Sequence, residues 1–222
     1  CDKWDFNVFT MQDMTRCGSL FYVMYALFLR YGFPKKFGIP EDILINFLSQ
    51  IESGYHPNPY HNSMHAADVA HIVHYILTPG GLAKTAKLTE EDTFAALIAG
   101  MIHDFDHPGI NNSYHVKVQS YLAILYNDRS ILENHHCAEV FELLKHPRFN
   151  VLGTLNEEQR KDIRETIIEM VLSTDMGLHA KIMNAWKRRI ATDSNLHLKK
   201  DDQRLALSMA IKMADISNCG RP

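Results

Sequence analysis

The segment 101–109 carries the densest chemistry in this sequence. It reads Met-Ile-His-Asp-Phe-Asp-His-Pro-Gly, so that His103, Asp104, Asp106 and His107 follow directly on an apolar run. Imidazoles and carboxylates beside a core helix are costly to bury unless something pairs with them. Neutral imidazole and carboxylate together form a normal ligand set for zinc and related divalent metals. The segment therefore predicts a metal site that takes part in chemistry.

Two further histidines stand four residues apart where a loop is expected to enter a helix. On a helix that spacing places His61 and His65 on one face, and His65 also shares the apolar face of Val69 and Ile72, which directs it inward. Taken alone, His65 is also typical of a core histidine bonded to a backbone carbonyl, and His61 of an exposed loop histidine. Both interpretations stay open for these two residues by themselves.

Two other short motifs combine carboxylates with polar partners. Glu133 and His136 lie three residues apart on an expected helix and so share a face. Taken singly, that pair is typical of a solvated helix surface. Thr174 and Asp175 follow an apolar helical stretch, where polar residues most often cap a helix end. Neither motif indicates a site until it is placed beside the others.

Near the end of the chain, Asp215 is embedded in the sequence Met-Ala-Ile-Lys-Met-Ala-Asp-Ile. A carboxylate in such apolar surroundings needs a partner. Lys212 lies one helical turn earlier and is one candidate for that partner. The sequence around Asp215 is therefore compatible both with an ion pair and with a metal ligand.

The elements that must position these side chains all have helical periodicity. Alternating apolar and polar stretches of strand length are absent, and this predicts an all-α fold. Asn62 suits the N-cap of one helix, Thr89 with Asp92 approximates a capping box for another, and two prolines in segment 54–59 require a loop. Helices are expected over residues 19–30, 41–51, 62–77, 89–102, 118–126, 130–144, 157–172, 178–190 and 202–216.

Composition limits the class of protein. The 222 residues are 46% hydrophobic and 22% charged, which suits one large globular domain. A net charge of −3 provides no basic field for a nucleic-acid partner. Four scattered cysteines, an apolar run at 20–29 too short for a bilayer, and no signal peptide favour a cytoplasmic location without a transmembrane segment. Because the chain begins at Cys1 and stops at Pro222 just after an apolar segment, we expect an excerpt from a larger protein.

The order of these motifs is more informative than any one of them. A histidine, then a His-Asp pair, then a distant aspartate is the pattern of the His-Asp metal-dependent phosphohydrolases. Within that superfamily the sequence resembles the catalytic domain of class I 3′,5′-cyclic nucleotide phosphodiesterases, truncated at its C-terminal end. The resemblance rests on six segments: YHNSMHAADV at 60–69, HDFDHPG at 103–109, LYND at 125–128, LENHH at 132–136, VLSTDM at 171–176 and ADISN at 214–218.

The resemblance implies a compact multi-helix domain with two divalent metals. It assigns a tightly bound zinc to four residues: His65, His103, Asp104 and Asp215. Asp104 would bridge to a second metal, magnesium or manganese, which keeps most of its waters. The waters of that second metal would be held by His107, Glu133 and Thr174, with Asp175 and His136 supporting the site from further out.

The same resemblance implies a reaction. A hydroxide bridging the two metals would attack phosphorus, and His61 would protonate the leaving O3′ as general acid. Tyr60 and Asn218 would lie near the base, and Asn218 matches several cAMP-preferring members, so we expect cAMP weakly over cGMP. The glutamine and aromatic clamp with which the family grips the base have no counterpart in residues 1–222.

Other interpretations remain at this stage. The chain could act on another phosphoester, be a catalytically silent cyclic-nucleotide-binding module, or be a helical interaction domain with incidental histidines. Residues 1–58 are expected to form an N-terminal helical subdomain, and residues 59–222 the metal-binding core. A homodimer and attached regulatory domains stay open, because the periodicity identifies no interface.

Overall fold

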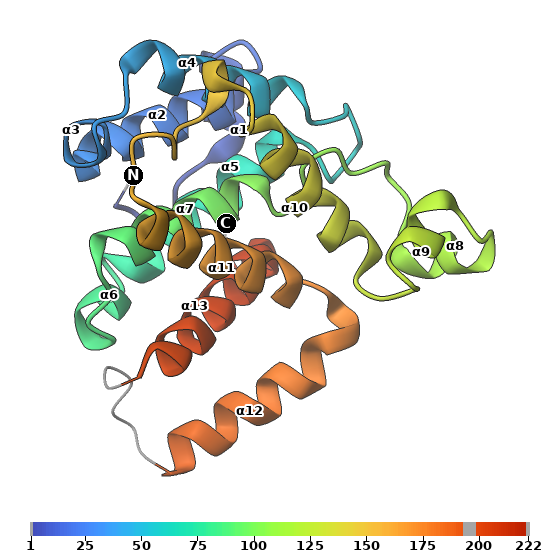
Figure 1. Ribbon diagram of the computed structural model, residues 1–222. Coiled ribbons are helices and arrows are strands. Elements are labelled where there is room, and N and C mark those ends of the chain that lie inside the picture. Colours follow the sequence, from blue (N-terminus) through green and yellow to red (C-terminus); the bar gives the residue numbers. More distant parts are fainter. Residues whose placement is uncertain (1, 193–198, 221–222) are drawn as a thin grey trace.

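The computed structural model describes residues 2–192 and 199–220, so Cys1 and Pro222 lie outside the described residues. Within these ranges every regular element is a helix (Figure 1), as the sequence predicts. The α-helices are α1 Val8–Met14, α2 Ser19–Tyr31, α3 Phe33–Phe37, α4 Glu41–Ser53, α5 Ser63–Leu77, α6 Leu82–Thr85, α7 Glu90–Ile102, α8 Asn112–Lys117, α9 Tyr121–Leu125, α10 Ile131–Leu143, α11 Glu157–Ser173, α12 His179–Thr192 and α13 Lys200–Asp215.

The core is built around α5 and α7, which cross at its centre and pack against α2, α11 and α13. Every residue of α7 from Asp92 to Ile102 is buried, as expected for a helix that is covered on all sides. A side chain at Gly100 would place its Cβ 3.2 Å from Ala70 Cα of α5. Glycine at this crossing lets the two helices approach closely and brings the end of α7 beside the start of α5.

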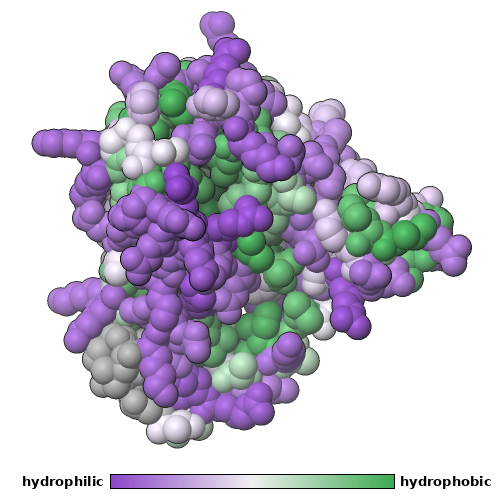
Figure 2. Space-filling model, in the orientation of Figure 1, coloured by the Kyte–Doolittle hydropathy of each residue, from purple (hydrophilic) through white to green (hydrophobic). Residues whose placement is uncertain are grey.

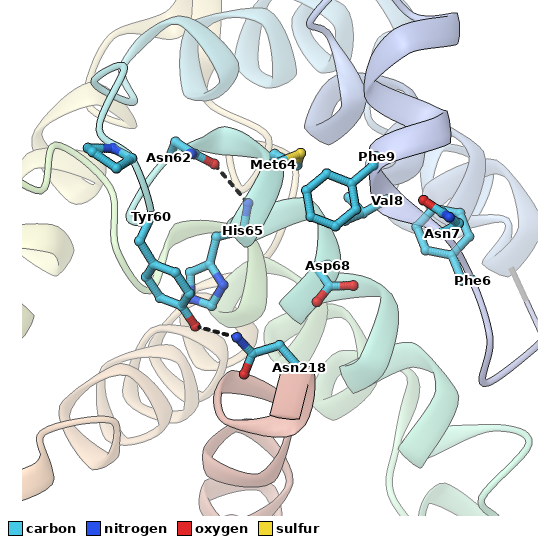
Figure 3. A pocket seen from close by; sticks show the side chains of 11 residues that line it. Phe6, Asn7, Val8, Phe9, Tyr60, Asn62, Met64, His65, Asp68 and Asn218 are labelled. Atoms are coloured by element: carbon cyan, nitrogen blue, oxygen red, sulfur yellow. Dashed lines mark hydrogen bonds between the residues drawn. The ribbon is translucent and has the colours of Figure 1, made fainter. Parts of the chain in front are cut away.

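Local capping sets the ends of these two helices. The Asn62 side chain accepts a hydrogen bond from His65 N at 3.1 Å (Figure 3), and Thr89 and Asp92 form a reciprocal capping box. Both caps were predicted from the sequence and both are confirmed. Each satisfies backbone N–H groups that a helix start leaves unpaired, so the positions of His65 and of the His103-Asp104 pair follow from local sequence.

The segment between α7 and α10 differs from the sequence prediction. A helix was predicted over 118–126, but α9 covers only Tyr121–Leu125. Gln119 adopts a left-handed φ of 50°, and Ser120 caps the new helix by accepting from Ala123 N. The short helix α8, which begins at Asn112, was not predicted at all. Figure 2 shows apolar side chains gathered on the lobe that α8 and α9 form, where Ile124 is 69% exposed.

One apolar cluster runs from Val8 to Ala214 and contains residues from both sides of the expected boundary at residue 58. The division of the chain into two parts therefore stays a prediction. Among the described residues, none of the helices combines the length and apolar character that crossing a bilayer would need.

Candidate metal centre

Four side chains from distant parts of the chain meet at one point. They are His65 of α5, His103 and Asp104 after α7, and Asp215 at the end of α13, and one ligand atom from each lies within 4.8 Å of the others. His65 Nε2 lies 3.0 Å from Asp215 Oδ1 and 3.3 Å from His103 Nε2. Asp104 Oδ2 lies 3.3 Å from His103 Nε2 and 3.5 Å from His65 Nε2. The structure thus brings together the four residues that the sequence proposed as metal ligands.

The chemistry of this donor set fits a divalent cation. His103 Nδ1 donates to Gly100 O at 2.9 Å, which leaves Nε2 as the ring atom that faces the cluster. Such a hydrogen bond behind a ligand histidine fixes its orientation and raises its basicity. Two imidazole nitrogens and two carboxylates therefore point at one small volume, an arrangement that needs positive charge between them.

The protonation of the cluster points the same way. Burial alone would raise the pKa of the Asp104 carboxyl, but the charge and hydrogen bond of the adjacent His103 imidazole hold that pKa well below its usual range. Burial would lower the pKa of His103, yet the nearby Asp104 and Asp215 carboxylates raise it well above 6.5. The carboxylates of the cluster thus favour positive charge beside them, which a bound cation would supply.

The cluster lies at the base of a cleft of about 690 Å³. Asp104 and Asp215 line it, whereas His65 and His103 are buried behind them. The cleft is also lined by every residue that the sequence proposed around the second metal, together with the proposed general acid: His61, His107, Glu133, His136, Thr174 and Asp175.

Helix α10 contributes two groups to the wall of the cleft. His136 Nδ1 donates to Phe105 O at 2.5 Å, and its Nε2 lies 3.8 Å from Asp104 Oδ1. Burial lowers the pKa of His136 to about 3, so the ring is neutral. Glu133, one turn earlier, accepts from Asn112 Nδ2 at 2.9 Å, and burial raises the pKa of its carboxyl to about 7.

Asn112 is a part of this wall that the sequence analysis missed. Besides holding Glu133, it accepts from Leu132 N at 3.0 Å through its side-chain oxygen. An asparagine a few residues after a His-Asp segment looks like a capping residue, and Asn111 does cap α8 by accepting from Tyr114 N. Only the contact with α10, 20 residues further along, distinguishes Asn112 from its neighbour.

The end of α11 supplies the opposite wall. Thr174 Oγ1 donates to Val171 O at 2.8 Å, and the Asp175 carboxylate accepts from Ser130 Oγ at 2.8 Å and from Gly177 N at 2.7 Å. Lys212, one open candidate for the partner of Asp215, makes its hydrogen bond elsewhere. Its Nζ donates to Ser173 O at 2.8 Å instead, because α13 packs against the end of α11.

His61 and His107 form a stacked pair on the third wall. Their ring centroids are 3.9 Å apart and their planes are inclined by 11°. Gly109 N donates to His107 Nδ1 at 3.0 Å, so the neutral His107 ring carries its proton on Nε2. Burial lowers the pKa of His107 to about 4 and also lowers the pKa of His61 below 6.5.

Tyr60 and Asn218 lie beside the cluster on the side away from α10. Asn218 Nδ2 donates to the Tyr60 hydroxyl at 3.2 Å, and the Tyr60 ring lies 4.6 Å from the His65 ring (Figure 3). Both line a second cavity of about 200 Å³, together with Phe6 and Phe9 of the N-terminal segment. The structure therefore groups these two residues next to the ligand cluster.

Two histidines and two aspartates that converge at the base of a cleft in a helical domain form a His-Asp cluster that could hold a divalent metal. The sequence profile of the 3′5′-cyclic nucleotide phosphodiesterase family matches residues 60–222. The chain belongs to this family, and the resemblance seen in its sequence motifs is confirmed.

Several curated relatives align over most of the chain. It is 38% identical to the probable 3′,5′-cyclic phosphodiesterase pde-1 of Caenorhabditis elegans, with 99% of this chain and 32% of that protein covered. It is 40% identical to the human dual specificity calcium/calmodulin-dependent 3′,5′-cyclic nucleotide phosphodiesterase 1C (98% and 30%). It is 45% identical to 3′,5′-cyclic-AMP phosphodiesterase 4 of Dictyostelium discoideum (83% and 18%). The chain thus spans less than a third of the length of these relatives.

Solved structures agree with the fold. The phosphodiesterase domain of the RhoPDE fusion protein from Salpingoeca rosetta superposes with a TM-score of 0.89 at 32% identity, over 100% of this chain and 68% of that one. LmjPDEB1, solved in complex with IBMX, superposes with a TM-score of 0.90 at 33% identity, over 98% and 66%. Likeness at this level confirms the all-α architecture.

Proposed function

We propose that this protein hydrolyses a 3′,5′-cyclic nucleotide to the 5′-monophosphate. The observation that carries the proposal is the convergence of four ligand groups at the base of a cleft with His61 on its wall. Membership of the cyclic nucleotide phosphodiesterase family supports the same reaction. The family and the His-Asp cluster together also support binding of divalent metal.

We assign a tightly held metal, zinc, to His65, His103, Asp104 and Asp215, and a second metal, magnesium or manganese, to Asp104 as a shared ligand. When bound, such a pair supplies a hydroxide nucleophile from water near neutral pH and neutralises charge on the phosphoryl oxygens. Asp104 can serve both metals because a carboxylate has two oxygens, and its Oδ2 lies near His103 and His65 while its Oδ1 lies 3.8 Å from His136 Nε2. Burial of His65 and His103 leaves little of either side chain in contact with bulk water.

The walls of the cleft are suited to hold and orient water. The proton of neutral His107 is on Nε2, so this ring can donate a hydrogen bond to a water oxygen. Neutral His136 presents Nε2 as an acceptor, because its Nδ1 is bonded to Phe105 O. We assign His107, Glu133 and Thr174 to water contacts, and His136 and Asp175 to orienting the groups behind them.

We assign proton donation to His61. When the bond between phosphorus and O3′ breaks, the oxygen leaves as an alkoxide that needs a proton, and protonated His61 supplies it from Nδ1 or Nε2. Burial lowers the pKa of this ring, which makes its conjugate acid stronger but less populated at neutral pH. A well-placed general acid contributes roughly 10²- to 10⁴-fold to the rate.

The proposal also covers the residues that contact the base of the nucleotide. We assign Tyr60 and Asn218 to contacts near it, since both flank the cluster. On the identity of Asn218 we favour cAMP over cGMP. The names of the relatives include both a cyclic-AMP enzyme and a dual-specificity enzyme, so the preference has to be measured.

The test is hydrolysis of cAMP and cGMP by the purified full-length protein with Mg²⁺ or Mn²⁺. We expect 5′-monophosphate as product, near-complete loss of turnover in Asp104→Asn together with loss of the second metal, and a loss of roughly 10²-fold or more in His61→Ala with metal content retained. The ratio of the two kcat/KM values would determine the base preference. A folded, metal-loaded protein that converts neither nucleotide would disprove the function.

A further inference from the structure

The loop that carries His61 is docked against the loop that carries His107. His56 Nε2 of the first loop lies 2.7 Å from Asp106 Oδ1 of the second. The His61 and His107 rings stack at 3.9 Å. Between these two contacts lies Asn58, whose side chain is half-buried. The two loops are therefore joined at several points, and Asn58 is the one whose side chain reaches the main chain of His61 itself.

Asn58 joins them directly through its side-chain amide. Nδ2 donates to His61 O at 3.0 Å and to His107 O at 2.7 Å. A primary amide has two N–H donors, and here each one reaches the backbone carbonyl of one member of the stacked pair. One side chain thus links the main chains of the two histidines whose rings are in contact.

The surroundings hold this amide in place. Pro57 and Pro59 flank Asn58 and restrict the backbone on both sides. Asn62 Nδ2 donates to the backbone oxygen of Asn58 at 2.9 Å, which ties the loop to the start of α5. Gly109 has a φ of 81°, and a Cβ there would lie 3.0 Å from Asn58 Oδ1. The second loop therefore approaches Asn58 as closely as only glycine allows.

We propose that Asn58 is a positioning residue for His61: its two amide hydrogen bonds fix the His61 and His107 backbones so that the rings stack and His61 faces the cleft. Asn58 does not itself line the cleft, and its effect is exerted through His61. The inference rests on the proposed function, because it assumes that His61 donates the proton to the leaving group.

The test compares two leaving groups. The O3′ alkoxide of cAMP needs a proton from an acid, whereas the nitrophenolate of bis(4-nitrophenyl) phosphate leaves without one. Asn58→Asp keeps the size of the side chain and removes both N–H donors. We expect it to lower kcat on cAMP by roughly 10- to 100-fold and kcat on the nitrophenyl ester by less than about threefold. In a His61→Ala background, Asn58→Asp should cause no further loss on cAMP.

His56→Ala is the matched control. It removes a contact between the same two loops and leaves both Asn58 hydrogen bonds in place, so the ratio of the two activities should stay at the wild-type value. Equal losses on both substrates in Asn58→Asp would indicate a general disruption of the loop and would overturn the inference. An unchanged ratio in a folded variant would overturn it as well.

A measurement without turnover separates this inference from the proposed function. A ring stacked at 3.9 Å shifts the proton resonances of its neighbour upfield. We expect the His61 ring protons to lose that shift in Asn58→Asp and to keep it in His56→Ala. If the wild-type protein converts no cyclic nucleotide, the proposed function fails, and the resonances alone decide whether Asn58 positions His61. A retained shift in Asn58→Asp would refute the positioning role.

Discussion

Replacing Glu133 by glutamine tests the electrostatics of the cleft. Glu133 is half-buried on α10, and burial raises the pKa of its carboxyl from 4.5 to about 7, although Asn112 donates to it at 2.9 Å. The Asp175 and Asp104 carboxylates raise this pKa further. Glutamine keeps the shape of the side chain and an acceptor for Asn112, but it carries no charge at any pH.

The expected effect on stability follows from the two pKa values. The unfolded chain releases this proton near pH 4.5 and the folded protein near pH 7. The contribution of the protonated carboxyl to stability is therefore fully present below pH 4.5 and is lost as the pH rises through about 7. At about 1.4 kcal/mol per pKa unit the loss is about 3.5 kcal/mol at most. Water reaches a half-buried carboxyl, so we expect a loss of about 1–3 kcal/mol.

Urea unfolding of chelator-treated wild-type and Glu133→Gln protein at pH 5 and pH 8 measures this loss. The two proteins should differ little at pH 5, and the variant should be more stable by about 1–3 kcal/mol at pH 8. Because every other titrating group is common to both proteins, the difference isolates Glu133. Added Mg²⁺ should narrow the gap at pH 8, since a nearby cation favours the ionised carboxyl. Parallel pH dependences would refute the reasoning.

Two buried hydrogen bonds behind the cluster give further predictions. The Tyr55 hydroxyl donates to Met101 O at 2.7 Å in the last turn of α7, so Tyr55→Phe should cost about 1–2 kcal/mol of unfolding free energy. Urea denaturation measures this loss, and Tyr22→Phe is the control because Tyr22 is 50% exposed. Equal midpoints would show that the carbonyl finds another donor. Lys212→Met leaves Ser173 O without its donor at 2.8 Å and should cost about 1–3 kcal/mol. The exposed Lys161→Met is its control, and an effect no larger than that of the control would contradict the assignment.

Much of the scaffold could be predicted because its signals are local. A capping asparagine before His65 and a capping box before α7 each act within four residues, and both are present. The long helices follow from apolar periodicity for the same reason. The short helix α3 was missed because it lies between two left-handed glycines, Gly32 and Gly38, which in the sequence look only like breaks.

The ligand set could be proposed from the sequence, but its supporting contacts could not. The order of the motifs indicated the family, and the resemblance to that family assigned His65, His103 and Asp215 as ligands. Asn58 and Asn112 are different, since a loop asparagine has many local uses. Their partners here lie 49 and 21 residues away. Lys212 was one candidate partner for Asp215 by its proximity in the sequence, but its Nζ donates to Ser173 O, 39 residues away.

Three backbone groups fix the orientation of histidine rings in the site. Gly100 O, Phe105 O and Gly109 N each bond one ring nitrogen of a different histidine, at 2.9, 2.5 and 3.0 Å. These hydrogen bonds to the backbone fix which nitrogen of each ring faces the site before a metal binds. This arrangement costs folding free energy, because two carboxylates and several imidazoles are brought together with little solvent around them. A ligand that binds only the folded state lowers this cost by mass action. A metal bound to this cluster would therefore stabilise the fold, and its removal would lower the free energy of unfolding.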